Sequence, residues 1–265
     1  SFKSKPIYWF GERVFPSGPL KTFFKRILLQ PIILMTDGIL AVSEEGISSY
    51  QSYGYKKQCH NIPYNINDNK FKKDLLDNTA LTEWKKKLNL DNKIIVLTSG
   101  SLIERKGMDT AIKSFKSISD KNKLHSELWI LGDGELRSEL ELIAQDEENI
   151  KFLGFLQPSD VPFIFGLSDI FLFCSRYDGW GVVVNEALSA GLPVITSKQA
   201  SSCELVSNGK VGYVHDCENI SKFSESLNIL ISDTNLRTEL SLKAKIIASE
   251  WNSSVIAEKV TNIIK

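Results

Sequence analysis

The sequence predicts an α/β fold in which helices are packed around a parallel β-sheet. From Lys93 onward, short apolar runs alternate with stretches whose apolar residues recur at helical spacing. This alternation is typical of βαβ units, in which consecutive parallel strands are joined by right-handed helical crossovers. Glycines follow several of the predicted strands, at points where the chain must turn toward the next helix.

Each strand is expected where an apolar run is bounded by polar or turn-forming residues. The predicted strands are Ile94–Leu97, Leu128–Leu131, Ile150–Leu153, Ile170–Phe173, Pro193–Thr196 and Val211–Val214. Helical spacing of apolar residues predicts the helices between them, as at Met108, Ala111, Ile112, Phe115 and Ile118, and again at Leu136, Leu140, Ile143 and Ala144. A helix from about Gly181 to Ala190 should end at Gly191, because a glycine followed closely by a proline is a stop signal.

After the last predicted strand the chain should be helical at Ile220–Ile231, Leu236–Ser249 and Val255–Ile264. The first part of the chain has a different sequence pattern. It is predicted to contain a basic amphipathic stretch, a strand and a helix, at Leu20–Leu34, Gly38–Val42 and Glu45–Tyr53. This part resembles the tail of another α/β unit, and the Asn- and Pro-rich segment Asn61–Asn69 is the candidate linker.

The expected domains are therefore residues 1–75, a partial first domain with its linker; residues 76–250, the main domain; and residues 251–265, a helix that packs back on the first domain. The chain opens at Ser1 without an initiator methionine, and we expect it to be truncated at this end.

Composition disfavours several classes of protein. Lys plus Arg and Asp plus Glu both number 32, so no net positive field favours nucleic acid. The cysteines lack the close spacing of a zinc or redox site, which predicts free thiols in a reducing cytoplasm; they are Cys59, Cys174, Cys203 and Cys217. The histidines, His60, His125 and His215, also lack metal spacing. The longest apolar run, Pro31–Val42, is shorter than the roughly 20 residues that span a bilayer.

The most informative window is Ser175–Gly191, where a predicted strand passes into a helix. Ligands bind at this edge of open α/β sheets, and glycines at a helix start can present amides to an anion such as a diphosphate. Asp178 and Glu186 lie eight residues apart, about 12 Å along an ideal helix. One carboxylate could bind sugar hydroxyls and the other a ribose diol. The spacing is equally compatible with a turn-forming Asp178 and a solvated Glu186.

A second loop, Ser99–Gly107, places Arg105 and Lys106 beside another predicted helix start. Cations beside exposed amides suit a phosphate, although taken alone the pair is more typical of a solvated surface. A third loop, Gly132–Gly134, has a glycine pattern similar to that of dinucleotide sites. It lacks the third glycine and the acidic residue of that fingerprint, so a hydride-transfer enzyme is disfavoured.

Taken together and in this order, these windows resemble the C-terminal domain of family-4 retaining glycosyltransferases, which have the GT-B fold. The resemblance is carried by Gly100–Gly107, Leu128–Arg137, Phe152–Asp169 and Ser175–Thr196. Two further segments, Asp37–Ser43 and Ile62–Asn65, resemble the last strand of the family's N-terminal domain and the crossing into the C-terminal domain. The fold class implied is α/β of GT-B type: a Rossmann-like, parallel-sheet C-terminal domain plus the C-terminal remnant of a second Rossmann-like domain.

The resemblance also implies residue roles. Glu186 would hold the donor ribose, Asp178 would contact the donor sugar, and Lys106 would neutralise the phosphates as the leaving group departs. The other implied donor-binding residues are Gly100, Ser101, Arg105 and Gly107; Leu153, Gly154 and Phe155, through their backbone at the base; and Gly179, Trp180, Gly181 and Val182, through their amides at the diphosphate.

Two positions depart from the family pattern. Asp178 stands where a glutamate is usual, and Ser101 stands where many relatives have an arginine, for which Arg105 is the candidate replacement. No metal and no cofactor are implied, because cations and helix amides would do the work of Mg²⁺. Trp180 is expected to be a core residue, with covering the sugar as the alternative.

The function implied is transfer of a sugar from a nucleotide diphosphate sugar to a glycan, lipid-linked or other acceptor, such as a bacterial surface polysaccharide. The anomeric configuration would be retained by front-face attack. The family's glycine-rich acceptor loop should lie upstream of Ser1. The alternative is a non-catalytic nucleotide-sugar-binding fragment or degenerate homologue. An epimerase or phosphorylase would need further catalytic acids or a cofactor lysine, and none is identified.

The expected location is cytoplasmic, with peripheral contact at the inner face of the membrane as an option. The stretch Lys21–Met35 combines Lys21, Lys25 and Arg26 with large apolar residues and could lie on an anionic membrane surface. Because its apolar residues cover more than one helix face, a buried helix is the preferred interpretation.

Overall fold

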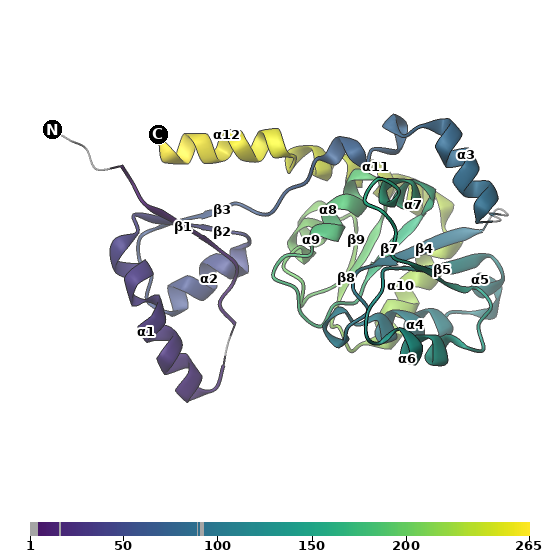
Figure 1. Cartoon of the computed structure of the whole chain (residues 1–265), viewed down its shortest axis with the longest axis horizontal. Helices are drawn as coiled ribbons and strands as arrows, with labels where there is room; N and C mark the ends of the chain where they lie inside the picture. The colour runs from purple at the N-terminus through teal and green to yellow at the C-terminus, as the bar shows by residue number, and fades with distance from the viewer. Residues whose placement is uncertain (1–4, 16, 89, 91–92) are drawn as a thin grey trace. The chain divides into compact units, whose positions relative to one another are not determined.

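The computed structural model describes residues 5–15, 17–88, 90 and 93–265, with residues 208 and 209 described by their backbone alone. The chain divides into two compact units, residues 1–65 with 254–265, and residues 66–253. The boundary after Asn65 falls inside Asn61–Asn69, the segment predicted to be the linker. Each unit has its own parallel sheet, drawn in Figure 1.

The larger unit is built on a fully parallel sheet in the order β6-β5-β4-β7-β8-β9. Its strands are β4 (Ile94–Ser99), β5 (Ser126–Leu131), β6 (Ile150–Gly154), β7 (Ile170–Phe173), β8 (Val194–Ser197) and β9 (Gly212–His215). The residues of β5, β7 and β8 are buried at every position. This is the pattern of strands covered on both faces, which explains why they appear in the sequence as continuous apolar runs.

Two helical layers cover this sheet (Figure 1). One layer contains α4 (Met108–Lys116), α5 (Asp120–Leu124), α6 (Arg137–Ala144) and α10 (Ile220–Ser232). The other contains α3 (Asn78–Lys87), α7 (Val161–Leu167), α8 (Val182–Ser189), α9 (Cys203–Gly209) and α11 (Thr234–Glu250). The core between the sheet and the first layer includes Ile112, Phe115, Leu128, Phe223 and Leu227, none of which is exposed. Burial of these side chains is the main stabilising contribution in this unit.

The smaller unit contains β1 (Tyr8–Gly11), β2 (Gly38–Ala41) and β3 (Gln58–Asn61), paired in parallel in that order. Its helices are α1 (Pro19–Met35), α2 (Glu44–Ser52) and α12, which spans Ser253–Ile264. The core is small and is formed by Ile39, Ala41, Tyr50 and Tyr55. The last helix is tied to this unit by a hydrogen bond from Lys259 Nζ to the carbonyl oxygen of Asn61, 2.7 Å long.

The α/β class predicted from the sequence is confirmed, and every predicted strand and helix is present within a few residues. Several elements were not predicted. The strand β3 has the polar sequence Gln-Cys-His-Asn, and α7 is short and contains Pro162 and Gly166. Short 3-10 turns also occur at Asp68–Lys70, Lys73–Leu75 and Glu104–Lys106.

One expectation about burial is wrong. None of the 17 residues of α1, all of which the structure describes, is buried, whereas the sequence favoured a buried helix. Only part of its surface packs on the small core, through Leu29 and Ile33. Among the described helices, none is long and apolar enough to cross a bilayer.

Candidate functional site

The two loops singled out in the sequence meet at the point where the strand order of the larger sheet reverses. From β4 the chain proceeds to β5 on one side, and from β7 it proceeds to β8 on the other, while β4 and β7 pair directly. In open parallel sheets the carboxyl ends of two such strands border a crevice, which is where ligands bind. The loops that follow β4 and β7 therefore occupy the ligand-binding edge of this fold.

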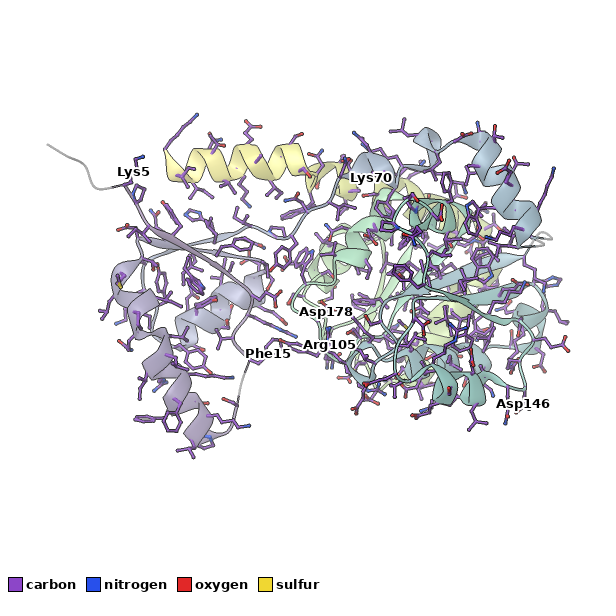
Figure 2. All side chains as sticks on the ribbon, viewed as in Figure 1. Lys5, Phe15, Lys70, Arg105, Asp146 and Asp178 are labelled. Carbon is purple, nitrogen blue, oxygen red and sulfur yellow. The ribbon has the colours of Figure 1, made fainter. Side chains whose placement is uncertain are left out.

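A close ion pair joins these loops. Lys106 Nζ lies 2.6 Å from Asp178 Oδ2, and the two side chains are only 15% and 13% exposed. Arg105 Nη1 lies 3.4 Å from the same oxygen and donates to the carbonyl oxygen of Tyr177 at 3.0 Å. Arg105 and Asp178 are labelled in Figure 2. Two cations of one loop thus converge on the carboxylate of the other, and both belong to the set predicted from the sequence.

Gly107 permits this close approach of the loops. Its φ is +63°, and a Cβ atom placed there would lie 2.1 Å from the carbonyl oxygen of Cys174. Any other residue would force the loops apart or strain the backbone. The glycines of the third loop also serve packing, because a Cβ on Gly132 would lie 2.1 Å from the carbonyl oxygen of Gly100. A Cβ on Gly134 would likewise lie 2.6 Å from the carbonyl oxygen of Leu102, so packing accounts for the Gly-Asp-Gly pattern without a dinucleotide.

A second connection between the loops comes from Arg176, which sequence reasoning missed. Its Nη1 and Nη2 atoms donate to Oδ1 and Oδ2 of Asp109 at 2.8 and 2.9 Å, and Nη1 also donates to the carbonyl oxygen of Glu104. Partial burial alone would raise the pKa of Asp109, but hydrogen bonds from Arg176 and Lys113 lower it to about 2. Nothing in the sequence distinguishes Arg176 from an ordinary surface arginine.

Glu186 lies on α8, the helix that begins at the end of the second loop. Burial raises the pKa of this carboxyl group to about 7. Among the described residues, none forms a hydrogen bond or ion pair with the Glu186 carboxylate. A half-buried acid without a protein partner is not a solvated helix position, which was the alternative interpretation of the sequence. Such a group is suited to exchange hydrogen bonds with ligand hydroxyls.

The start of α8 offers amides to an anion. Its N-cap residue is Gly181, which has no side chain to accept hydrogen bonds from the first turn, and Val182 is exposed. Helix N-termini left open in this way favour anions. Gly179, Gly181 and Val182 therefore lie where the sequence placed them, at the edge beside β7.

The side chain of Trp180 is a core residue. Its indole is 1% exposed and donates from Nε1 to Asn185 Oδ1 at 2.7 Å. The alternative in which Trp180 covers the donor sugar is therefore wrong, because the ring packs inward beneath the loop. Its backbone amide lies 3.3 Å from Asp178 Oδ1, so Asp178 also serves as a turn residue.

The remaining predicted residues lie on the same edge of the sheet. Gly100 follows β4, and Ser101 beside it is exposed. Leu153 and Gly154 end β6, which is separated from β4 by β5, and Phe155 follows this strand. Phe155 is exposed, and the carbonyl oxygen of Gly154 already accepts from the amide of Gly132 at 2.9 Å. The described residues include no cluster of His, Cys, Asp or Glu that could hold a metal ion.

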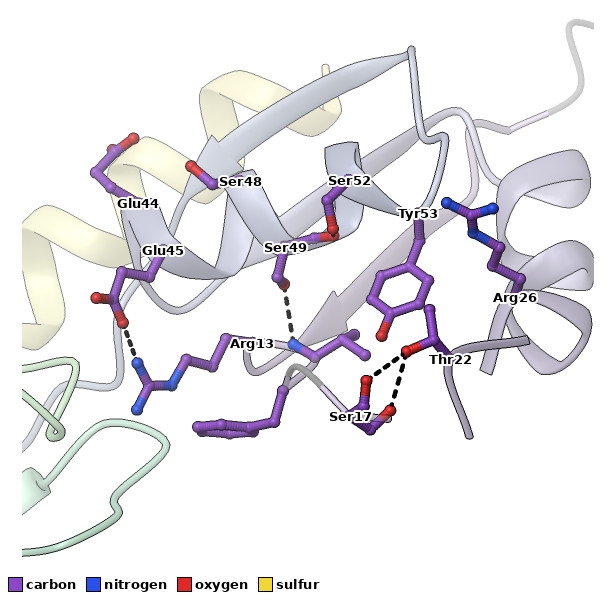
Figure 3. A pocket seen from close by; sticks show the side chains of 12 residues that line it. Arg13, Ser17, Thr22, Arg26, Glu44, Glu45, Ser48, Ser49, Ser52 and Tyr53 are labelled. Atoms are coloured by element: carbon purple, nitrogen blue, oxygen red, sulfur yellow. Dashed lines mark hydrogen bonds and ion pairs between the residues drawn. The ribbon is translucent and has the colours of Figure 1, made fainter. Parts of the chain in front are cut away.

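The smaller unit has a pocket of about 750 Å³ at the carboxyl ends of β1 and β2. The residues that line it include six with hydroxyl groups, Ser17, Thr22, Ser48, Ser49, Ser52 and Tyr53, together with Arg13 and Arg26. Figure 3 shows the hydroxyls of Tyr53, Thr22 and Ser17 pointing toward one another, and the ion pair between Arg13 and Glu45. This pocket was not predicted from the sequence, because scattered serines form no recognisable pattern.

The fold and the site define an α/β protein of GT-B type, with a ligand-binding edge where its larger sheet reverses direction. Solved structures share this fold. WaaG, a glycosyltransferase involved in lipopolysaccharide biosynthesis, matches with a TM-score of 0.78 and 20% identity over 97% of this chain and 74% of its own. Anabaena HepE in complex with UDP matches with a TM-score of 0.86 and 19% identity over 98% of this chain and 72% of its own.

Curated relatives are more similar in sequence. Spore coat protein SA of Bacillus subtilis is 32% identical over 61% of this chain and 45% of its own length. A GDP-mannose-dependent monoacylated alpha-(1-6)-phosphatidylinositol monomannoside mannosyltransferase of Corynebacterium glutamicum is 26% identical over 89% of this chain. The chain spans 64% of that relative. The family model described as glycosyl transferases group 1 matches residues 81–246, and the chain belongs to this family.

Proposed function

We propose that the whole protein transfers a sugar from a nucleotide diphosphate sugar to an acceptor and that the larger unit binds this donor. The observation that carries the proposal is the convergence of Lys106 and Arg105 on Asp178 beside the open start of α8. Family membership supports it, as do relatives named as glycosyltransferases and a solved structure of the same fold in complex with UDP.

In this proposal the diphosphate binds between Lys106 and the first-turn amides of α8. To reach Lys106, the phosphate must compete with Asp178, whose carboxylate is then released toward the sugar hydroxyls. Glu186 accepts or donates hydrogen bonds at the ribose diol. Charge developing on the leaving phosphate is stabilised by Lys106, Arg105 and the helix start, an electrostatic contribution of the kind that often dominates such reactions.

We further propose that transfer retains the anomeric configuration and that no metal is needed. The leaving phosphate would assist the acceptor on the same face of the sugar, and Lys106 would hold that phosphate in place. This part of the proposal comes from the family resemblance. The stereochemical outcome can be measured by NMR, since the anomeric coupling constant of the first product distinguishes retention from inversion.

The acceptor is proposed to be a glycan or lipid-linked saccharide, bound in part by the hydroxyl-lined pocket of the smaller unit. Serine and tyrosine hydroxyls both donate and accept hydrogen bonds, as sugar hydroxyls require, and Arg26 adds a cation for an anionic group. Relatives named for a capsular polysaccharide and for a lipopolysaccharide core support this class of acceptor. Action at the cytoplasmic side of the membrane is part of the same proposal.

A non-catalytic nucleotide-sugar-binding protein is the second candidate. The observation that favours it is the use of Asp178 within the protein, where Lys106, Arg105 and the Trp180 amide all contact its carboxylate. If these contacts persist when the donor is bound, the Asp178 carboxylate cannot bind the sugar hydroxyls. The two candidates differ in one measurement: the full-length protein with donor and acceptor releases free nucleotide only if it is a transferase.

The donor site is tested by calorimetric titration of the chain with UDP, GDP and ADP. We expect saturable binding of one nucleotide and its loss in Glu186→Ala. Glu239→Ala is the matched control, because Glu239 lies on the surface of α11 and pairs with Lys243. Absence of binding at millimolar concentrations of all three nucleotides would contradict the proposal.

A further inference from the structure

The helix α1 presents a wide apolar surface that nothing in the described part of its unit covers. Seven of its large apolar side chains are between 52% and 74% exposed: Leu20, Phe23, Phe24, Ile27, Leu28, Leu34 and Met35. Soluble proteins expose single apolar residues routinely, but a contiguous patch marks an interaction surface.

These residues are contiguous on the helix. At about 100° per residue they fall, with Pro31, within one arc of roughly 140°. The core contacts of the helix, Leu29 and Ile33, lie outside this arc. The helix is therefore apolar on two sides: one holds it to the small core, and the other faces outward.

Cations border the outward arc. By the same geometry Lys21 and Lys25 lie along one border and Arg26 beyond the other. At the end of the helix, Lys57 Nζ donates to the carbonyl oxygens of Leu34 and Thr36. Residues 13–36 include no aspartate or glutamate, so no acid offsets these charges along the helix.

We propose that α1 docks lengthwise on an anionic lipid surface. Its apolar arc would enter the boundary between headgroups and acyl chains, while Lys21 and Arg26 extend to the lipid phosphates. Lys25 adds positive charge nearby, although its Nζ donates to the carbonyl oxygen of Phe15 at 2.6 Å. An apolar arc flanked by cations is the arrangement of helices that lie in a bilayer interface. A protein partner would have to match the same cations with acids and bury the whole arc, whereas a lipid surface supplies both features at once.

This inference does not depend on the donor site, and it extends the proposed function. Arg26 both borders the arc and lines the hydroxyl-rich pocket of the same unit. A helix docked on lipid would hold that pocket beside the headgroups. An acceptor carried by a lipid would then reach the pocket without leaving the membrane.

The test is flotation of the chain with vesicles of phosphatidylcholine alone and of phosphatidylcholine mixed equally with phosphatidylglycerol. We expect strong binding only to the anionic vesicles. The double variant Phe23→Ser with Phe24→Ser should lose this binding. Leu242→Ser with Ile246→Ser is the matched control, because these residues are similarly exposed on α11. Lys21→Gln with Arg26→Gln should weaken binding roughly thirtyfold, from about 1 kcal/mol for each cation.

Three outcomes would overturn the proposal: no binding to anionic vesicles, equal binding to both compositions, or binding that the phenylalanine variants retain. Concentration-dependent dimerisation that those variants abolish, without vesicle binding, would show instead that a second copy covers the arc. Circular dichroism checks that the variants fold. Nucleotide titration of the same samples keeps a failure of this proposal separate from a failure of the donor site.

Discussion

Arg176 and Asp109 form a two-point ion pair, with nitrogen to oxygen distances of 2.8 and 2.9 Å, that ties the loop after β7 to the helix after β4. Neither residue is expected to touch a nucleotide. Their contact fixes the relative position of the loops that carry Lys106 and Asp178. A planar guanidinium can make both hydrogen bonds at once, which a lysine cannot do. Arg176 is therefore a positioning residue of the proposed site.

Replacing Arg176 should loosen the site more than its surface location suggests. We expect Arg176→Lys to weaken nucleotide binding about tenfold and Arg176→Ala to weaken it further, because Asp109 then loses both guanidinium hydrogen bonds and retains the one from Lys113. Calorimetric titration measures both effects. Lys222→Gln, which breaks a surface pair with Glu225, should change nothing. Equal affinity in Arg176→Ala and the unmodified chain would remove Arg176 from the site.

Glu186 should make stability depend on pH in a defined direction. Its pKa is raised from 4.5 to about 7, so the folded chain holds this proton more tightly than the unfolded chain does. The resulting stabilisation is complete below about pH 4.5 and is lost as the pH rises through about 7. Its limit is roughly 3 kcal/mol. Urea unfolding of the chain and of Glu186→Gln across this range measures the difference. A difference that does not change with pH would refute the assignment.

Asp109 should act in the opposite direction. Its pKa is lowered to about 2 in the folded chain, so the stabilisation it provides is present above the ordinary pKa of 3.8. It is lost as the pH falls through about 2. The variant Asp109→Asn should therefore lose its stability deficit in strong acid, as measured by thermal unfolding at a series of acidic pH values. A deficit that persists below pH 2 would show that packing, and not charge, is the cause.

The ion pair between Lys106 and Asp178 predicts opposite effects on two ligands. In Asp178→Asn, Lys106 has no carboxylate to compete with a phosphate, so the free nucleoside diphosphate should bind as tightly as before or several-fold more tightly. The sugar nucleotide should not gain affinity in this variant, because the proposed contact between the Asp178 carboxylate and the sugar is lost. Lys106→Met should weaken the binding of both ligands. Parallel titrations with UDP and UDP-glucose, or with their counterparts with another base, measure these effects. Weaker binding of the nucleoside diphosphate to Asp178→Asn would contradict the proposed role of Asp178.

Gly107 should tolerate no side chain. Gly107→Ala places a Cβ against the carbonyl of Cys174 in a left-handed conformation, and we expect it to destabilise the chain by more than about 2 kcal/mol. Gly154→Ala is the matched control, because it has a similar φ but meets only the end of the Arg137 side chain. It should cost about 1 kcal/mol. Urea unfolding compares the two, and equal costs would mean that the loops can separate freely.

The sequence predicted most of the larger unit because its strands are buried on both faces and therefore appear as unbroken apolar runs. It also placed Lys106 and Asp178 on loops that the fold brings into contact. It could not predict the ion pair of Arg176, since the partners lie far apart in the chain and each looks like a surface residue. Trp180 was ambiguous for a related reason: its glycine neighbours suggest an exposed loop, but the indole turns inward to Asn185.

The smaller unit was predicted less well. Its strand β3 carries polar residues on a half-exposed edge, so periodicity gives no signal there. The apolar residues around α1 suggested burial, because a sequence does not distinguish an inward-facing apolar surface from an outward-facing one. The hydroxyl-lined pocket is formed by residues from the segment after β1, from α1 and from α2. These residues are separated in the sequence and come together only in the folded unit.

A crystal structure of the chain with the nucleoside diphosphate selected by titration would show directly whether the loops after β4 and β7 bind the donor. We expect a diphosphate between Lys106 and the first-turn amides of α8, a ribose within hydrogen-bond distance of Glu186, and Asp178 separated from Lys106. A nucleotide bound elsewhere, or one bound while the ion pair between Lys106 and Asp178 stays intact, would contradict this expectation.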